Sequence, residues 1–131
     1  MATFVFNKLV RDLIPDMLGM KGHQVEVRPL NAGELEHALL AKLQEEVKEL
    51  CEEKTQEGRL QELADVREVL DALMALWQIE SSQVEKARLE KVERHGAFYK
   101  GVFVEVVKID DDCLGDLAYL RSNANKYREI L

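Results

Sequence analysis

The sequence predicts an all-α protein, built as an antiparallel helical bundle with a small peripheral β-ribbon. The chain has 131 residues, of which 47% are hydrophobic and 33% are charged, a balance that suits one soluble domain with a single core. Two prolines and seven glycines leave few breaks for turns. Between residues 31 and 95, apolar side chains recur at helical spacing.

Short elements are expected before the main helices. Residues 4–6 are predicted to form a strand, and residues 9–20 a short helix that contains Pro15 near its middle or at a break. Gly22 marks a turn before a second strand at residues 24–28, where valines alternate with polar neighbours.

Three longer helices are predicted at about residues 31–53, 58–79 and 81–95. Asn31 is the expected N-cap of the first, with Glu34 as the reciprocal member of a capping box. A glycine at 58 precedes the second helix, and a serine at 81 or 82 caps the third. Short turns between the three helices favour an antiparallel bundle.

The last elements complete the ribbon and end the domain. Residues 102–107, VFVEVV, are predicted to form a strand that pairs with residues 24–28. The following DDDCLGD breaks the pattern. We therefore assign the domain to residues 1–107 and treat residues 108–131 as a C-terminal extension, either a short helix or a mobile tail.

Composition excludes several classes of partner. A net charge of -7 argues against a broad basic surface for nucleic acid. No apolar run approaches the length of a membrane span or a secretory signal, so we expect a cytoplasmic protein without membrane contact. Cys51 and Cys113 are too few for a disulfide framework and are expected to be free thiols.

Acidic residues occupy the apolar side of two predicted helices. On a wheel of about 100° per residue, several leucines of the first long helix lie within about 60° of Glu46, and Glu49 lies about 60° to one side. The next helix repeats the pattern, with valines and leucines around Glu62 and with Asp65 about 60° away. One such pair is usually a solvated face, but two pairs on the buried sides of neighbouring helices indicate a functional site.

A divalent metal would explain this arrangement. Converging carboxylates lose hydration and repel one another, which costs on the order of several kcal/mol unless a cation lies between them. An all-oxygen set of ligands favours a hard cation, so we expect Mg²⁺, with Mn²⁺ as a substitute.

The acidic motifs resemble those of a known family. Glu46xxGlu49, twelve intervening residues and Glu62xxAsp65 resemble the ExxE and ExxD signature of the all-α nucleoside triphosphate pyrophosphohydrolases, the MazG-like and phosphoribosyl-ATP pyrophosphohydrolase-like group. FNKLVRDLIP, KLQEEVKEL, LQELADVREVLDAL and KVERHGAFYKGVFVE resemble successive blocks of its single-domain branch. The resemblance covers about residues 4–106 in order.

The resemblance implies a bundle of the MazG-like type and a Mg²⁺-dependent hydrolase. It would cleave the α–β phosphate bond of a nucleoside triphosphate, giving a monophosphate and pyrophosphate, in a house-cleaning role. The implied metal ligands are Glu46, Glu49, Glu62 and Asp65. Glu45 or Glu49 is the expected catalytic base. The implied assembly is a homodimer or homotetramer.

Substrate contacts are expected from two basic groups. Lys8 and Arg11 match the NKLVRD block. Lys91 and Arg94 precede HGAF at residues 95–98, which begins with His95 and stands where the family usually has an Arg-Gly-Gly-Phe sequence.

Two alternatives stay open, and helix geometry rejects a third, the di-iron bundle. The substrate could be phosphoribosyl-ATP of histidine biosynthesis. The chain could be a non-catalytic helical oligomeric adaptor whose acids form salt bridges. A di-iron site would use the Glu34xxHis37 unit, but both of these side chains point away from Glu46, by about 120° and 180°.

Overall fold

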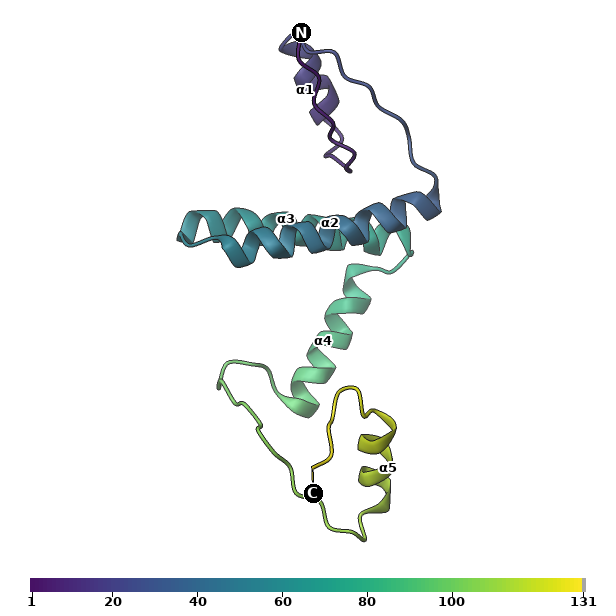
Figure 1. The fold of residues 1–131 in the computed structure, drawn as a ribbon, viewed down its shortest axis with the longest axis vertical. Coiled ribbons are helices and arrows are strands. Elements are labelled where there is room, and N and C mark those ends of the chain that lie inside the picture. Colours follow the sequence, from purple (N-terminus) through teal and green to yellow (C-terminus); the bar gives the residue numbers. More distant parts are fainter. Residues whose placement is uncertain (131) are drawn as a thin grey trace. The chain divides into compact units, whose positions relative to one another are not determined.

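The computed structural model describes residues 1–130. Within that range it contains helices and no β-strand (Figure 1). The helices are α1 (Ile14–Met20), α2 (Ala32–Glu52), α3 (Gln56–Leu76), α4 (Ser81–His95) and α5 (Leu114–Ser122). The predicted all-α class is confirmed. None of the helices in the described range is long and apolar enough to cross a membrane.

The predicted β-ribbon is not formed in the described residues. Segments 4–6, 24–28 and 102–107 are not strands, and their side chains are exposed. Alternating valines indicate strand propensity, but a strand also needs a paired neighbour to satisfy its backbone groups. Segments 24–28 and 102–107 belong to different compact units of the chain.

The chain divides into two compact units, one at Met1–Arg94 and the other from His95 onward. The predicted division lay later, at residue 107, because residues 102–107 were assigned to the ribbon. In the second unit the chain turns back after α5. Arg121 Nη2 lies 2.7 Å from Glu129 Oε1, and the rings of Tyr119 and Tyr127 lie 6.3 Å apart between centroids.

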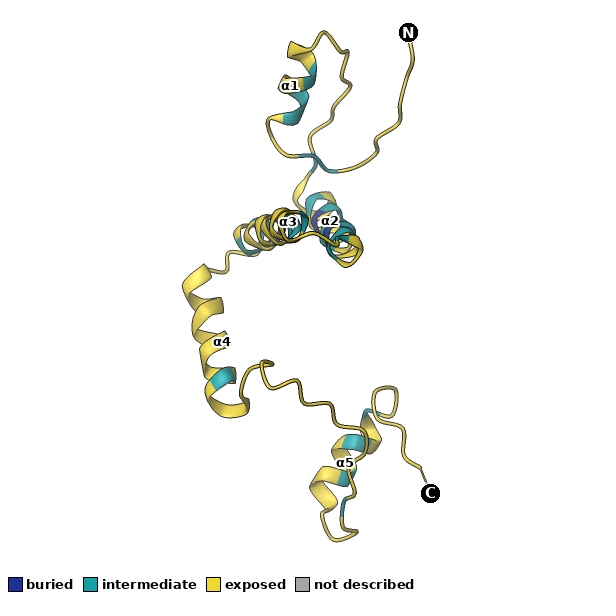
Figure 2. Cartoon of the chain, turned by 90° about the vertical axis from the view of Figure 1, so that its left-hand side faces the viewer, coloured by how far each residue is buried: buried dark blue, intermediate teal, exposed yellow. Residues whose placement is uncertain are grey.

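In the first unit, α2 and α3 pack side by side as an antiparallel hairpin, which both views show (Figures 1 and 2). Leu39 from α2 and Val69 and Leu73 from α3 are buried between the two helices. Partly buried hydrophobic residues pack around them: Leu9, Leu35, Leu43, Ala72 and Leu76. The leucine and valine stripes predicted beside Glu46 and Glu62 therefore face each other.

The third predicted member of the bundle does not extend this core. α4 contains no buried residue, and it is almost entirely exposed in Figure 2. Its sequence, SSQVEKARLEKVERH, has too few apolar residues to form a broad apolar stripe. Among residues 1–130, α2 and α3 are the one pair of helices that pack through several residues.

The N-terminal ends of the helices follow local hydrogen bonds. The predicted capping box of α2 is confirmed: Glu34 N donates to Asn31 Oδ1 at 2.9 Å, and Asn31 N donates to Glu34 Oε1 at 3.2 Å. α3 begins earlier than predicted because Thr55, rather than Gly58, marks its start. Gly58 N donates to Thr55 Oγ1 at 3.0 Å, which places the glycine in the first turn of the helix.

Two other predicted helix boundaries were wrong. Residues 9–13 lie outside α1, which begins at Ile14 with Pro15 in its first turn, where a missing N–H costs little. α3 ends at Leu76 rather than near Ile79, since Gln78 adopts φ 56°. Ile79 N then donates to Met74 O at 2.9 Å, the pattern of a Schellman motif.

Candidate metal centre

Three carboxylates converge between α2 and α3. Oxygens of Glu46, Glu49 and Glu62 all lie within 4.8 Å of one another. The first two lie one turn apart on the same side of α2, and the hairpin places Glu62 of α3 opposite them. The structure thus brings together three of the four predicted metal ligands.

Burial makes this group unusual. Glu46 is 6% exposed and is the one buried charged residue among residues 1–130. Its Oε2 atom and Oε2 of Glu62 are both buried without a hydrogen-bond partner. Buried acceptors in native proteins almost always have a donor or a cation, because an unsatisfied one is costly. These two oxygens therefore need a hydrogen-bond donor or a cation.

The pKa values of Glu62 and Glu49 show that these acids disfavour negative charge in the metal-free site. Burial, the contact with Glu46 and the charges of neighbouring acids raise the pKa of Glu62 to about 7. The pKa of Glu49 is also raised, first by burial and then by the charge of Glu46. The metal-free site therefore disfavours full ionisation.

Lysines offset part of this negative charge. Lys42 Nζ lies 3.3 Å from Glu46 Oε1 and 3.2 Å from Glu45 Oε1. Burial lowers the pKa of Lys42, but hydrogen bonds with these two glutamates outweigh burial and leave that pKa raised. Lys8 Nζ lies 3.7 Å from Glu45 Oε1. Glu45, one of the two predicted catalytic bases, is thus in contact with two ammonium groups.

The fourth predicted ligand, Asp65, is held differently. Its Oδ1 atom accepts a hydrogen bond from Arg11 Nη2 at 2.7 Å. Asp65 is not a member of the group defined by Glu46, Glu49 and Glu62. Asp65 lies three residues after Glu62 on α3, and its charge is one of the causes that raise the pKa of Glu62.

A hollow of about 260 Å³ adjoins the acidic group. Its walls combine positive, negative and apolar side chains: Lys8, Arg11, Lys42, Glu46, Asp65, Phe6, Val10 and Ile14. Two predicted substrate-binding residues, Lys8 and Arg11, therefore lie at the same hollow as two predicted metal ligands.

The remaining predicted substrate contacts lie elsewhere. Lys91, Arg94 and His95 are exposed on α4. Within residues 1–130 neither Lys91 nor Arg94 forms an ion pair. Lys91 and Arg94 therefore form no ion pair with the carboxylates of the metal centre in the described part of the chain.

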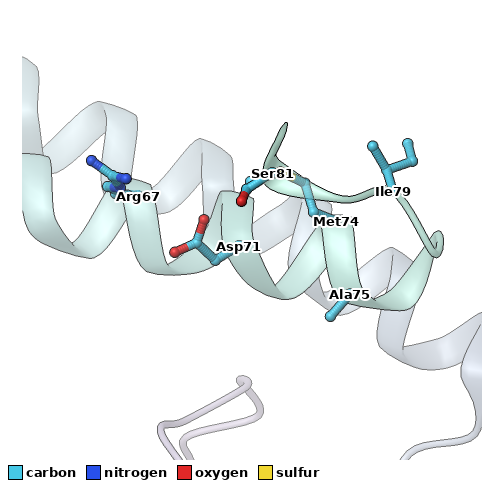
Figure 3. Close-up of a pocket in the computed structure, with 6 residues that line it drawn as sticks. All are labelled: Arg67, Asp71, Met74, Ala75, Ile79 and Ser81. Atoms are coloured by element: carbon cyan, nitrogen blue, oxygen red, sulfur yellow. The ribbon is translucent and has the colours of Figure 1, made fainter. Parts of the chain in front are cut away.

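A second hollow, of about 300 Å³, lies at the C-terminal end of α3. Figure 3 shows Arg67 and Asp71 on α3, with Ile79 and Ser81 from the chain that follows it. None of the predicted catalytic or metal-binding residues lines this hollow. The hollow beside Glu46 is therefore the better candidate for chemistry, although it is the smaller of the two.

The donor set fits a hard divalent cation. The three carboxylates supply oxygen ligands, and neither histidine nor cysteine takes part in the group. Mg²⁺ and Mn²⁺ prefer such ligands. The di-iron alternative has no support here, since Glu34 is engaged by Asn31 and by Arg28, whose Nη1 donates to Glu34 Oε2 at 2.9 Å.

Two contacts were not predicted from the sequence. Arg11 and Asp65 are separated by 54 positions, and no local pattern signals their pairing. The Nε1–H of Trp77 donates to Glu36 Oε1 at 2.7 Å, and the Trp77 side chain is partly exposed. Helical periodicity cannot specify either of these tertiary contacts.

Comparison of the chain with family models, curated proteins and solved structures gives no match. Function must therefore be inferred from the chain's own residues.

Proposed function

We propose that the chain is a Mg²⁺-dependent nucleoside triphosphate pyrophosphohydrolase. It would hydrolyse the α–β phosphate bond and release a nucleoside monophosphate and pyrophosphate, in a house-cleaning role. One observation carries the proposal: Glu46 is buried with an unpartnered oxygen and shares a 4.8 Å group with Glu49 and Glu62. A divalent cation would satisfy the orphan oxygens and offset the repulsion among the acids.

Glu46, Glu49 and Glu62 are the residues that would hold the ion, with Asp65 next to them. When bound, Mg²⁺ supplies charge neutralisation for the polyphosphate and acidifies an attacking water. Glu49 suits the role of proton acceptor, because its raised pKa moves it toward the range in which a general base works at neutral pH. Glu45 is the other candidate, although its contacts with Lys8 and Lys42 compete for its oxygens.

Positive side chains beside the acids suit a polyphosphate substrate. Lys8, Arg11 and Lys42 line the same hollow as Glu46. Phosphate oxygens that extend from the metal ligands into this hollow would meet these cations. Lys91, Arg94 and His95 remain candidate contacts from α4, to be tested by substitution.

A second copy of the chain is proposed to complete the MazG-like bundle. Leu63 and Leu70 of α3 and Trp77, the C-cap of that helix, recur every seven residues and are 55%, 41% and 44% exposed. On α2, Leu40 and Val47 have the same spacing and are also exposed. Pairing two hairpins through these residues would bury them in a homodimer, or in a homotetramer of two such pairs.

The direct test is turnover. The protein would be incubated with Mg²⁺ and a panel of canonical, deoxy and modified nucleoside triphosphates, with phosphoribosyl-ATP included. Pyrophosphate release is the expected result. Turnover of phosphoribosyl-ATP alone would favour the biosynthetic alternative, and orthophosphate release would indicate cleavage of a different bond.

The adaptor alternative is favoured by one observation: lysines and an arginine already contact some of the acids. Lys42 contacts Glu46, and Arg11 contacts Asp65. In an adaptor these ion pairs would be structural, and Mg²⁺ would not change the melting temperature. A rise in melting temperature with Mg²⁺ that disappears in the Glu62→Gln, Asp65→Asn variant would reject the adaptor.

A further inference from the structure

We propose that Arg11 is an exchangeable counter-ion of Asp65. It holds this carboxylate apart from Glu46, Glu49 and Glu62 in the metal-free chain, and it exchanges Asp65 for substrate phosphate when a divalent cation draws Asp65 to the metal ligands. The inference rests on the proposed function and adds to it a means of coupling metal loading to phosphate binding.

The N-terminal segment is positioned to do this. Leu9 packs against the hydrophobic core of the hairpin. On either side of this anchor, Lys8 lies 3.7 Å from Glu45 on α2, and Arg11 lies 2.7 Å from Asp65 on α3. The segment thus bridges both helices at the acidic group. Asn7 just before it adopts φ 43°, a left-handed conformation that asparagine tolerates better than most residues.

The acidic group itself has two independent marks of a cation site. Its three carboxylates lie within 4.8 Å of one another. Glu46 is also 6% exposed, with Oε2 lacking a hydrogen-bond partner. The lysine beside Glu46 contacts the other oxygen, Oε1, so Oε2 is left to accept a hydrogen bond or to bind a cation.

The contact between Arg11 and Asp65 is weak enough to be exchanged. Their side chains are 59% and 34% exposed, so water screens the pair. An exposed ion pair of this kind changes an equilibrium constant by at most about fivefold. A divalent cation attracts a carboxylate far more strongly than a solvated guanidinium does, so Asp65 would change partners when the ion binds.

Arg11 has a second use once it is released. Its side chain lines the hollow of about 260 Å³ that also includes Lys8 and Lys42. The planar guanidinium matches the geometry of phosphate oxygens. Released from Asp65, Arg11 would add one more cation to a wall that faces the substrate's phosphates.

The test compares Arg11→Gln with the wild type in two direct binding measurements. Calorimetric titration with Mn²⁺ alone should show about two- to fivefold tighter binding in Arg11→Gln, because Asp65 is free. Titration with inorganic triphosphate in saturating Mg²⁺ should show about tenfold weaker binding, because a charged hydrogen-bond donor is missing. Arg11→Gln should thus strengthen Mn²⁺ binding and weaken triphosphate binding. Loss of a purely structural contact would not change the two affinities in opposite directions.

Arg121→Gln is the matched control. It changes the net charge equally and removes a similarly exposed contact, that of Arg121 with Glu129 in the second unit; it should alter neither affinity. In an Asp65→Asn background, Arg11→Gln should no longer tighten Mn²⁺ binding. Melting by circular dichroism checks folding, and Arg11→Met, which removes the charge but keeps an aliphatic side chain, takes the place of Arg11→Gln in both titrations if that variant does not fold.

The outcomes separate this inference from the proposed function. Unchanged or weaker Mn²⁺ binding in Arg11→Gln, when the wild type binds the ion, would overturn the exchange and leave the hydrolase intact. The exchange would also be overturned if Arg11→Gln tightened Mn²⁺ binding as much in the Asp65→Asn background as in the wild type. That result would indicate a long-range charge effect. Absence of Mn²⁺ binding by the wild type would overturn the metal site itself.

Discussion

Glu46 of α2 and Glu62 of α3 face each other across the hairpin, and each has a carboxylate oxygen that is buried without a hydrogen-bond partner. The two helices are held together by Leu39, Val69 and Leu73, so hydrophobic packing opposes the electrostatic repulsion between the acids. Ion binding would remove that repulsion while the same packing stays in place.

Replacing one of these acids should separate stability from metal binding. Glu62→Gln is expected to raise the melting temperature of the metal-free protein at pH 8, since it removes a charge that burial and Glu46 disfavour. It should also abolish the stabilisation by Mg²⁺ and reduce turnover by about 100-fold or more, because a catalytic metal contributes several kcal/mol. Differential scanning fluorimetry and a pyrophosphate assay measure both.

Glu68→Gln is the matched control for this prediction. Glu68 is exposed on the same helix, and the substitution makes the same chemical change. It should behave as the wild type in both assays. A Mg²⁺-dependent rise in melting temperature that survives in Glu62→Gln would contradict the assignment of Glu62 as a metal ligand.

The stability of the metal-free protein should decrease as pH rises between about 4.5 and 7. The pKa of Glu62 rises from 4.5 to about 7 on folding, so in this window the folded chain keeps a proton that the unfolded chain has lost. The stabilising contribution is complete below pH 4.5 and is lost as pH passes about 7. Urea unfolding in the presence of a chelator, from pH 4.5 to 8, measures the trend.

Glu62→Gln should show a flatter pH profile than the wild type over the same range, while Glu49, whose pKa is raised in the same direction, retains part of the slope. Saturating Mg²⁺ should reverse the wild-type trend, because the ion binds the ionised carboxylates. Stability of the metal-free wild type that increases over this window would contradict the raised pKa.

The exposed heptad positions of α3 predict self-association. Replacing both Leu63 and Leu70 with glutamate should lower the molecular mass in solution toward the 15.0 kDa of one chain. Each leucine buried at an interface contributes about 1.5–3 kcal/mol, which buried glutamates would forfeit. Light scattering after size-exclusion chromatography measures the mass.

Leu89→Glu serves as the control for this interface, because Leu89 is also an exposed leucine but lies on α4. Its mass should equal that of the wild type. A wild-type mass already equal to one chain would reject the proposed dimer.

The end of α3 offers a stability test that involves no ligand. Gln78 adopts φ 56°, which costs a residue with a side chain about 1 kcal/mol relative to glycine. Gln78→Gly should therefore stabilise the fold by up to about 1 kcal/mol in urea unfolding. Gln61→Gly, an exposed site inside the same helix, should instead destabilise it by about 1 kcal/mol. If both variants stabilised the fold, or both destabilised it, the proposed cost of the Gln78 conformation would be contradicted.

Periodicity predicted the central hairpin well. Leu39 and Val69, expected beside Glu46 and Glu62, are buried, and the capping box at Asn31 forms as its sequence indicates. These features depend on residues within a few turns of one another, or on one face of one helix, and such information is local.

Features that depend on distant residues or on strained backbone were not predictable. Strand pairing of residues 24–28 and 102–107 requires a tertiary contact that valine alternation does not specify. The end of α3 depends on Gln78 occupying a conformation that usually signals glycine. Arg11 lies far from Asp65 along the chain, so its contact could be found only in three dimensions.

The hydrogen bond from Trp77 to Glu36 ties the last turn of the hairpin to the first turns of α2. The chain has a single tryptophan. Intrinsic fluorescence is therefore a built-in optical signal of whether this end of the hairpin is closed. Fraying there would hydrate the indole and shift its emission to the red, without any attached label.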